Sequence, residues 1–329
     1  MMKLLYLLFL IITHRDNPIR KIKRTSASTF EVSAYTFEED TTVSAGGINK
    51  TTAPFFKYSD GTTTLTPSGT TGSITLTAST DTFVSAHNGT YIQLGETPKQ
   101  LKITGFTSAT QVTAQVLEAL PNTDADADWA EELISAVRGF PQAVSFHDNR
   151  LWFGGVRDRP SAVVASQIGG YFNFDLGTGL ASEAINVAIA GDKVNEIRHF
   201  VSSRNLQIFT DAGEYYIPTS GNTAAVTPSN ITFLRQTPYG CNRAAPVPFD
   251  GATLFTQKNG KAVREFVFSD LEQAYKSTAV SVLSSQLIDS PKQISMLTGN
   301  NERPEQFAFF LNSGSNENGK IGVFHSIRD

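Results

Sequence analysis

Short apolar strands alternate with polar turns through the second half of the chain at a nearly constant interval. Four apolar segments begin at Leu151, Leu206, Leu254 and Phe307, which are 55, 48 and 53 residues apart. A repeat of roughly 50 residues is typical of propeller blades, each a small antiparallel sheet that is covered only when others stack beside it. The pattern therefore predicts a mostly β fold in which residues 139–329 form an incomplete, propeller-like β domain.

Residues that tolerate positive φ stand where these hairpins must turn. Asp148-Asn149 precedes the first apolar segment, while Asp211-Ala212-Gly213 and Lys258-Asn259-Gly260 follow the second and third. The fourth segment is followed by a polar turn that ends at Gly319. Because Asn, Asp and Gly are preferred in tight antiparallel turns, each repeat is expected to contain a strand, a turn and a returning strand.

The composition divides residues 1–120 into two segments. Residues 1–29 contain the apolar run Leu4–Ile12, which is too short to cross a bilayer and is expected to be a buried strand of a platform-like N-terminal strand segment; a short signal peptide is the alternative. Basic residues alternate with isoleucine in Pro18–Arg24, which is typical of a charge-protected edge strand or of a surface for DNA phosphates. Residues 30–120 are rich in Thr and predict an inserted small β domain.

A linker helix is expected over residues 121–138, one of few helices in the chain. Asp128 is placed to cap a helix over Trp129–Val137, whose apolar residues recur at helical spacing. Together with Asp124 and Asp126 it also resembles a calcium loop. A Trp and a Ser stand where an EF-hand loop needs Gly and Glu, so we do not expect a metal there.

Composition and charge exclude several classes of protein. The chain has 329 residues, a net charge of −4 and a single cysteine, Cys241. One cysteine excludes internal disulfides and a cysteine-based zinc site, and Cys241 is expected to be a small buried or turn residue. The net negative charge argues against a broad basic face that grips nucleic acid, although DNA could still pass through an assembly of such chains.

The spacings that signal catalysis or cofactor binding are missing. The sequence contains no Gly-x-Gly-x-x-Gly, phosphate loop, His-Glu-x-x-His or Gly-x-Ser-x-Gly, and Gly177-Thr178-Gly179 lacks the third glycine. The histidines have no ligand spacing and are expected to be surface or satisfied residues, with His147 at a polar strand position. They are His14, His87, His147, His199 and His325. We therefore predict no catalytic, cofactor-binding or metal-binding residues, and no enzyme.

Two features keep other functions open. Propeller glycosidases carry paired carboxylates near strand ends, where turn-forming aspartates are also common. The candidates are Asp148, Asp175, Asp192 and Asp211. A propeller that binds or depolymerises host-surface polysaccharide is therefore the second hypothesis. A secreted adhesin is the third, suggested by the Thr-rich domain and the apolar N-terminus. The chain also carries N-glycosylation sequons, which mean little if the host is bacterial. The sequons lie at Asn49, Asn88 and Asn230.

A long run of residues resembles one family of phage tail proteins. Gly139–Gly155, continued by Arg159-Pro160 and Ala165–Phe174, is similar to the tail tubular protein B, or nozzle protein, family of short-tailed bacteriophages and prophages. The similarity extends over about the last two-thirds of the chain. Its later segments are Val194–Phe209, Arg235–Gly240 and Asn259–Tyr275.

The resemblance implies a structural component of the virion tail and no catalytic residues. Members of the family form a hexameric ring whose lumen conducts the genome during ejection, with a tail adaptor protein, tail fibres and the passing DNA as partners and no membrane span. Members usually extend beyond both ends of this chain, so the resemblance also implies a fragment or a split gene product. Arg150 and Trp152 would be packing residues, with Trp152 between blades and Arg150 on a carboxylate or carbonyl.

Overall fold

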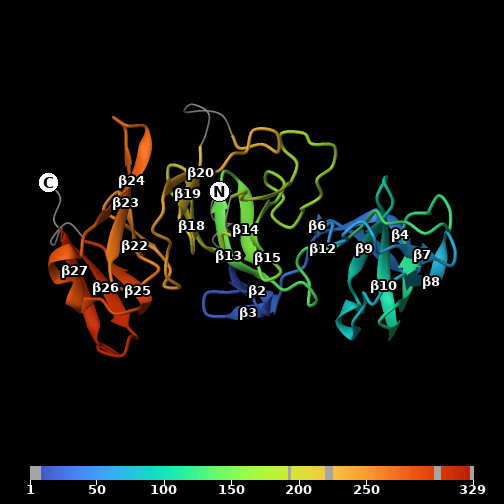
Figure 1. The fold of residues 1–329 in the computed structure, drawn as a ribbon, viewed down its shortest axis with the longest axis horizontal. Coiled ribbons are helices and arrows are strands. Elements are labelled where there is room, and N and C mark those ends of the chain that lie inside the picture. The colour runs from blue at the N-terminus through green and yellow to red at the C-terminus, as the bar shows by residue number, and fades with distance from the viewer. Residues whose placement is uncertain (1–8, 192–193, 219–224, 300–304, 327–329) are drawn as a thin grey trace.

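The computed structural model describes residues 9–191, 194–218, 225–299 and 305–326. The fold is mostly β, with five small antiparallel sheets arranged like propeller blades and one separate seven-stranded sheet (Figure 1). Within the described residues the helices are two short 3-10 turns, η3 (Ser85–His87) and η4 (Val282–Leu287). The predicted fold class is therefore confirmed.

Each of the four sequence repeats folds into one blade whose strands follow one another in chain order. Blade 1 contains β13 (Pro141–His147), β14 (Arg150–Val156), β15 (Arg159–Ala165) and β16 (Ile185–Ala188), and blade 2 contains β17 (Ile197–Ser202), β18 (Leu206–Thr210), β19 (Glu214–Ile217) and β20 (Leu234–Thr237). Blade 3 contains β21 (Val247–Phe249), β22 (Ala252–Thr256), β23 (Val263–Ser269) and β24 (Ala274–Ala279), and blade 4 contains β25 (Pro291–Leu297), β26 (Gln306–Asn312) and β27 (Ile321–Ser326). The four predicted apolar segments are the second strands of the four blades.

The second strand of each of the first three blades is covered on both faces. All residues of β14, β18 and β22 are buried. In β14, Trp152 shares a core with Leu206 of blade 2, whereas Phe153 packs on the opposite side. Because successive side chains of a strand point to opposite faces, a strand between two neighbouring sheets must be apolar throughout.

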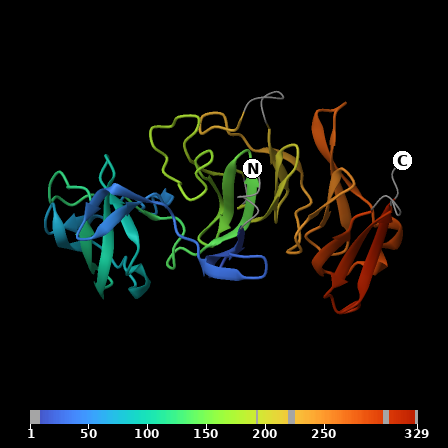
Figure 2. The same ribbon diagram turned by 180° about the vertical axis from the view of Figure 1, so that it is seen from behind.

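The same alternation connects the later blades. Phe209 of blade 2 and Phe255 of blade 3 meet with ring centroids 5.2 Å apart. On the other face of β22, Leu254 shares a core with Ile294 and Phe310 of blade 4. Blade 4 lies at one end of the molecule and the seven-stranded sheet at the other (Figures 1 and 2).

The N-terminal sheet takes the place of a fifth blade beside blade 1. It consists of β1 (Phe9–His14), β2 (Asn17–Arg24) and β3 (Phe30–Ala34). Ile11, Ile19 and Tyr35 pack against blade 1. The prediction that Pro18–Arg24 is an edge strand is wrong, because β2 lies in the centre and pairs with both neighbours.

The apolar run Leu4–Ile12 is only partly described, since residues 1–8 lie outside the described residues. Its last residues belong to β1, so the prediction of a strand is confirmed for them. The prediction that the strand is buried holds only for Ile11, because Leu10 and Ile12 are exposed. Only one face of the N-terminal sheet is covered by blade 1, and alternate side chains therefore point to solvent.

The Thr-rich region forms a seven-stranded sheet with a core of its own. The strand order is β6-β12-β9-β10-β11-β8-β7, and Leu76, Ile92 and Leu101 are among its fully buried residues. The strands are β6 (Phe55–Phe56), β7 (Leu65–Pro67), β8 (Gly72–Ala78), β9 (Tyr91–Leu94), β10 (Lys99–Ser108), β11 (Gln111–Val116) and β12 (Trp129–Glu132). The hairpin β4 (Glu39–Ala45) and β5 (Ile48–Thr51) precedes it.

The prediction of a linker helix over residues 121–138 is wrong. Residues Trp129–Glu132 form β12, which pairs with β9 and β6. Trp129 belongs to the core of the seven-stranded sheet, whereas Leu133 belongs to the core of blade 1, so their helical spacing reflects a chain that passes from one core to another. Asp128 does not cap a helix; it accepts a hydrogen bond from Lys57 at 2.7 Å. The insert therefore starts after β3 and ends with β12.

We expect Trp152→Ala to lower the free energy of unfolding by about 3–5 kcal/mol, because it removes a fully buried ring between blades 1 and 2. Urea denaturation followed by circular dichroism measures this loss. Leu271→Ala, at an exposed tip of blade 3, is the control and should change stability by less than about 0.5 kcal/mol. Equal unfolding midpoints for both variants would contradict a core built between stacked blades.

Candidate functional site: polar junctions between the blades

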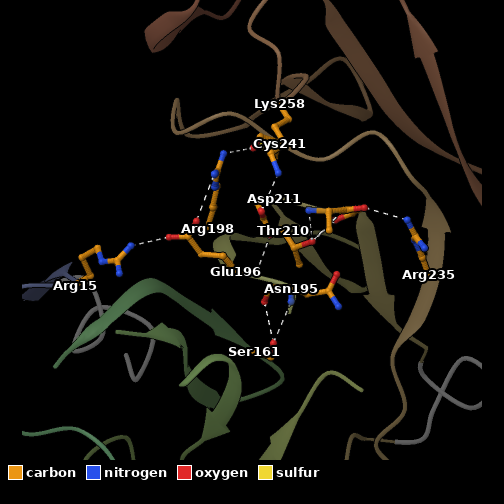
Figure 3. Close-up of polar contacts among 12 residues, drawn as sticks. Arg15, Ser161, Asn195, Glu196, Arg198, Thr210, Asp211, Arg235, Cys241 and Lys258 are labelled. Carbon is orange, nitrogen blue, oxygen red and sulfur yellow. Dashed lines mark hydrogen bonds and ion pairs between the residues drawn. The ribbon is translucent and has the colours of Figure 1, made fainter. Parts of the chain in front are cut away.

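One edge of the blade series carries charged side chains that connect successive sheets (Figure 3). Arg15 lies in the β1–β2 turn, Glu196 directly precedes β17, Asp211 lies in the β18–β19 turn and Lys258 lies in the β22–β23 turn. Turns at the same end of stacked sheets lie close together. This geometry assembles groups that are far apart in the sequence.

Two arginines converge on Glu196. Arg15 donates from Nη1 to Glu196 Oε1 at 2.8 Å, and Arg198 Nη2 lies 3.3 Å from Oε2. Arg198 also donates from Nη1 to the carbonyl of Cys241 at 2.6 Å. Glu196 therefore connects the N-terminal sheet to blade 2, and Arg198 connects blade 2 to the segment that enters blade 3.

Asp211 makes the next junction. Its Oδ1 accepts the backbone N–H of Glu196 at 2.9 Å, and its Oδ2 accepts Lys258 Nζ at 2.9 Å. Burial alone would raise the pKa of Asp211, but the hydrogen bonds from Lys258 and Glu196 outweigh it and lower the pKa. Lys261 and Asp289 repeat the arrangement between blades 3 and 4, with an N–O distance of 2.5 Å.

Asp148 and Asp211, two of the candidate carboxylates, do not form a hydrolytic pair. Asp148 lies between the first and second strands of blade 1, while Asp211 lies between the second and third strands of blade 2, so they occupy opposite ends of the blades. Asp175 accepts the N–H of Gly177 in the loop before β16. Asp192 lies outside the described residues. At least Asp211 serves as a junction group held by a cation.

A second polar cluster joins the seven-stranded sheet to blade 1, and sequence reasoning missed it. Arg138 donates two hydrogen bonds to Glu131, at 2.8 and 2.6 Å, and His87 Nε2 lies 3.3 Å from Glu131. Burial alone would raise the pKa of Glu131. The hydrogen bonds from His87 and Arg138 have the larger effect, so the pKa is lowered. Asp158 of blade 1 lies 3.8 Å from Arg138. Glu131 and His87 are separated by 44 residues, so no local sequence pattern could predict that they meet.

The remaining histidines occupy structural positions. His147 is buried because blade 2 covers it, and its Nδ1 lies 2.9 Å from Ser202 Oγ. The alternating pattern predicted a polar strand position. The contact with Ser202 satisfies Nδ1 of His147, whereas Nε2 is buried without a hydrogen-bond partner among the described residues. Burial lowers the pKa of His199 to about 4. His14 bonds Asn17, and His325 stacks on a phenylalanine ring.

The two packing roles implied by the family resemblance are confirmed. Arg150 is fully buried and donates to the carbonyls of Ser166, Glu183 and Ala181 at 2.6–2.7 Å. Trp152 fills the core between blades 1 and 2. Cys241 is a free, buried cysteine, as expected, and burial raises the pKa of its thiol.

A shallow groove of about 460 Å³ lies between the N-terminal sheet and the loop of blade 1. Phe9, Tyr171 and Phe172 supply aromatic rings, and Lys21 lies 5.1 Å above the Phe172 ring. Glu38 lines the groove as well. Aromatic rings with a few polar groups are common in ligand sites.

The described residues contain no group of three metal-ligating side chains and no helix long and apolar enough to span a membrane. Neither a family model nor a curated protein matches the chain. Among solved structures, the chain is similar to an auxiliary nutrient binding protein from Bacteroides thetaiotaomicron, with 11% identity over 83% of this chain and 69% of that chain. The TM-score is 0.31, which carries no argument about fold or function.

Glu214 is a further buried carboxyl group at the junction of blades 2 and 3. It is fully buried at the start of β19 and accepts a hydrogen bond from Thr237. Burial raises its pKa from the ordinary value of 4.5 to about 7, and the hydrogen bond from Thr237 only partly offsets this. Ionising Glu214 therefore opposes folding.

We expect the stability of the protein to fall as pH rises from about 4.5 to about 7, because folded Glu214 holds a proton that the unfolded chain has released. The contribution of Glu214 to this loss is about 3 kcal/mol. Glu214→Gln keeps the shape without the charge and should be more stable than the native protein at about pH 8, but not at about pH 4.

Urea denaturation at both pH values measures this difference. Glu272→Gln, at an exposed residue of blade 3, is the matched control and should follow the native pH profile. A Glu214→Gln variant that keeps the full native pH dependence would show that Glu214 ionises normally in the folded protein.

Proposed function

We propose that this chain is a structural subunit of a phage tail nozzle, the ring-shaped conduit through which a genome leaves the virion. The observation that carries the proposal is the open series of stacked sheets. Blade 4 and the N-terminal sheet lie apart in both views, and both expose large apolar side chains (Figures 1 and 2). A stack of sheets with uncovered apolar ends is suited to continuation by neighbouring chains.

The residues that resemble the nozzle family support a structural role. They build blade 1 and its contact with blade 2, where Gly155 has a φ of +69° and a Cβ would lie 2.2 Å from the Ile197 carbonyl oxygen. A Cβ at Gly154 would lie 2.4 Å from the Phe200 ring. Only glycine allows the two sheets this approach. The motif therefore serves close packing between blades.

The partners follow from the same proposal. Six copies would form the ring, beside a tail adaptor protein and tail fibres, with the genome passing through the lumen. The acidic and basic groups of the polar junctions pair with one another, as in Glu196 with Arg15 and Asp211 with Lys258. Paired charges and a net charge of −4 leave little attraction for DNA phosphates, which favours sliding over binding.

The groove that contains Tyr171 and Phe172 favours one other function. Its aromatic rings line the groove together with Lys21 and Glu38, a combination that would suit a sugar ring with polar substituents. A host-surface polysaccharide-binding protein is therefore the second candidate. It would bind as a monomer or an oligomer and would depend on the groove.

We expect the purified full chain to form ring-shaped particles in negative-stain images and discrete oligomers by mass photometry. Duplex DNA should bind only weakly, with a Kd of about 10⁻⁴–10⁻⁶ M at physiological salt, by fluorescence anisotropy. No reducing sugar should appear on incubation with host polysaccharide.

A monomer that binds polysaccharide, and loses this binding on Phe172→Ala, would overturn the nozzle proposal in favour of the second candidate. Phe106→Ala, at an exposed residue of the seven-stranded sheet, is the control for nonspecific effects of losing an exposed ring.

A further inference from the structure

The N-terminal sheet has an uncovered apolar face, here called the front face. Cross-strand pairing places Leu10, Ile22 and Val32 in one row, and Arg24 beside Phe30 in another. Phe30 and Val32 are each 65% exposed. Directly paired residues of antiparallel strands share a face, so this face lies opposite the one that contacts blade 1.

Blade 4 has a matching uncovered face, here called the back face. Strand register places Phe309 beside Val323, Leu311 beside Ile321, and Leu297 beside Phe307. Ile321 is 60% and Val323 52% exposed, whereas Ala308 and Phe310 on the other face are buried against blade 3. The back face thus has the composition of a face between blades.

We infer that the front face of one copy of this chain packs against the back face of the next copy. Each face belongs to a terminal sheet whose other face already contacts a blade. A front-to-back contact covers both faces at once and repeats from copy to copy, which is the heterologous contact that generates rings. The inference rests on the proposed function and identifies the surfaces that such a ring would use.

Charge favours this pairing over the symmetric one. Arg20 and Arg24 lie on the front face, and the guanidinium of Arg24 donates to the carbonyls of Ser26 and Ala27 in its own turn. Two front faces would bring these cations together, and like charges across an interface are costly. The back face presents mainly apolar side chains with Gln293, Ser295 and His325. It can therefore accept the basic front face without repulsion.

Cross-linking between single-cysteine positions tests the contact in the full chain. Val32→Cys marks the front face and Val323→Cys the back face, and the native Cys241 is buried and serves as the unreactive background. With a flexible bismaleimide, a mixture of the two variants should yield cross-linked dimers. Each variant alone should yield none.

Charged substitutions give an independent measure. Val32→Glu or Val323→Glu would bury a carboxylate in the contact and should raise the concentration needed for half-maximal assembly at least about tenfold, by mass photometry. Leu283→Glu, at an exposed residue of η4 outside both faces, should leave assembly unchanged. Circular dichroism checks that each variant folds.

Each other outcome overturns the inference in a distinct way. Cross-links within a single variant would show a symmetric contact, and a chain carrying both cysteines that cross-links only to itself would show that the blade series closes within one copy. Rings without front-to-back cross-links, and unaffected by the charged variants, would remove the inference and leave the nozzle proposal standing. A strictly monomeric protein would remove both.

Discussion

The structure depends on one constraint: a sheet that is apolar on both faces must be covered on both sides. β14 satisfies it by placing Trp152 toward blade 2 and Phe153 toward the N-terminal sheet. Burying one large side chain contributes about 1.5–3 kcal/mol, and the second strand of each of the first three blades repeats the arrangement. The blades are therefore stable as a series, and the series has two ends at which the same requirement is unmet.

Ion pairs along one edge complement this apolar packing. Apolar faces of similar shape do not by themselves specify which sheet follows which, whereas Glu196 and Asp211 each need a particular cation at a particular turn. Partly exposed ion pairs contribute little to stability, roughly 0–1 kcal/mol each. Their larger effect is to penalise a wrong neighbour, because a displaced carboxylate would lose its partner. Apolar packing between the blades thus supplies most of the stability, and the ion pairs along the edge specify which sheets become neighbours.

The sequence predicted features that depend on local interactions and missed features that depend on contacts between residues far apart in the chain. The interval between Leu151 and Leu206 reflects a repeat of local hairpins, and the turn at Asp148-Asn149 has positive φ at both residues, as its composition predicted. The prediction of a helix from Trp129 onward was wrong because the apolar residues of this segment belong to two different cores. The sequence did not indicate that the N-terminal sheet is a blade. Only one face of this sheet is covered, so apolar and polar residues alternate along its strands and no continuous apolar run marks them. The cluster of Glu131 with His87 joins strands that only the tertiary fold brings together.

That cluster also determines how the seven-stranded sheet is held. The sheet has its own core, and its attachment to blade 1 includes the buried carboxylate of Glu131, which contacts both Arg138 and His87. Replacing such a buried pair by apolar residues is often neutral, whereas removing one partner costs about 3–5 kcal/mol. The arrangement therefore fixes the orientation of the insert more than it adds stability. In the proposed ring, a fixed orientation would be the useful property, because every copy would have to present its insert at the same angle to its neighbours.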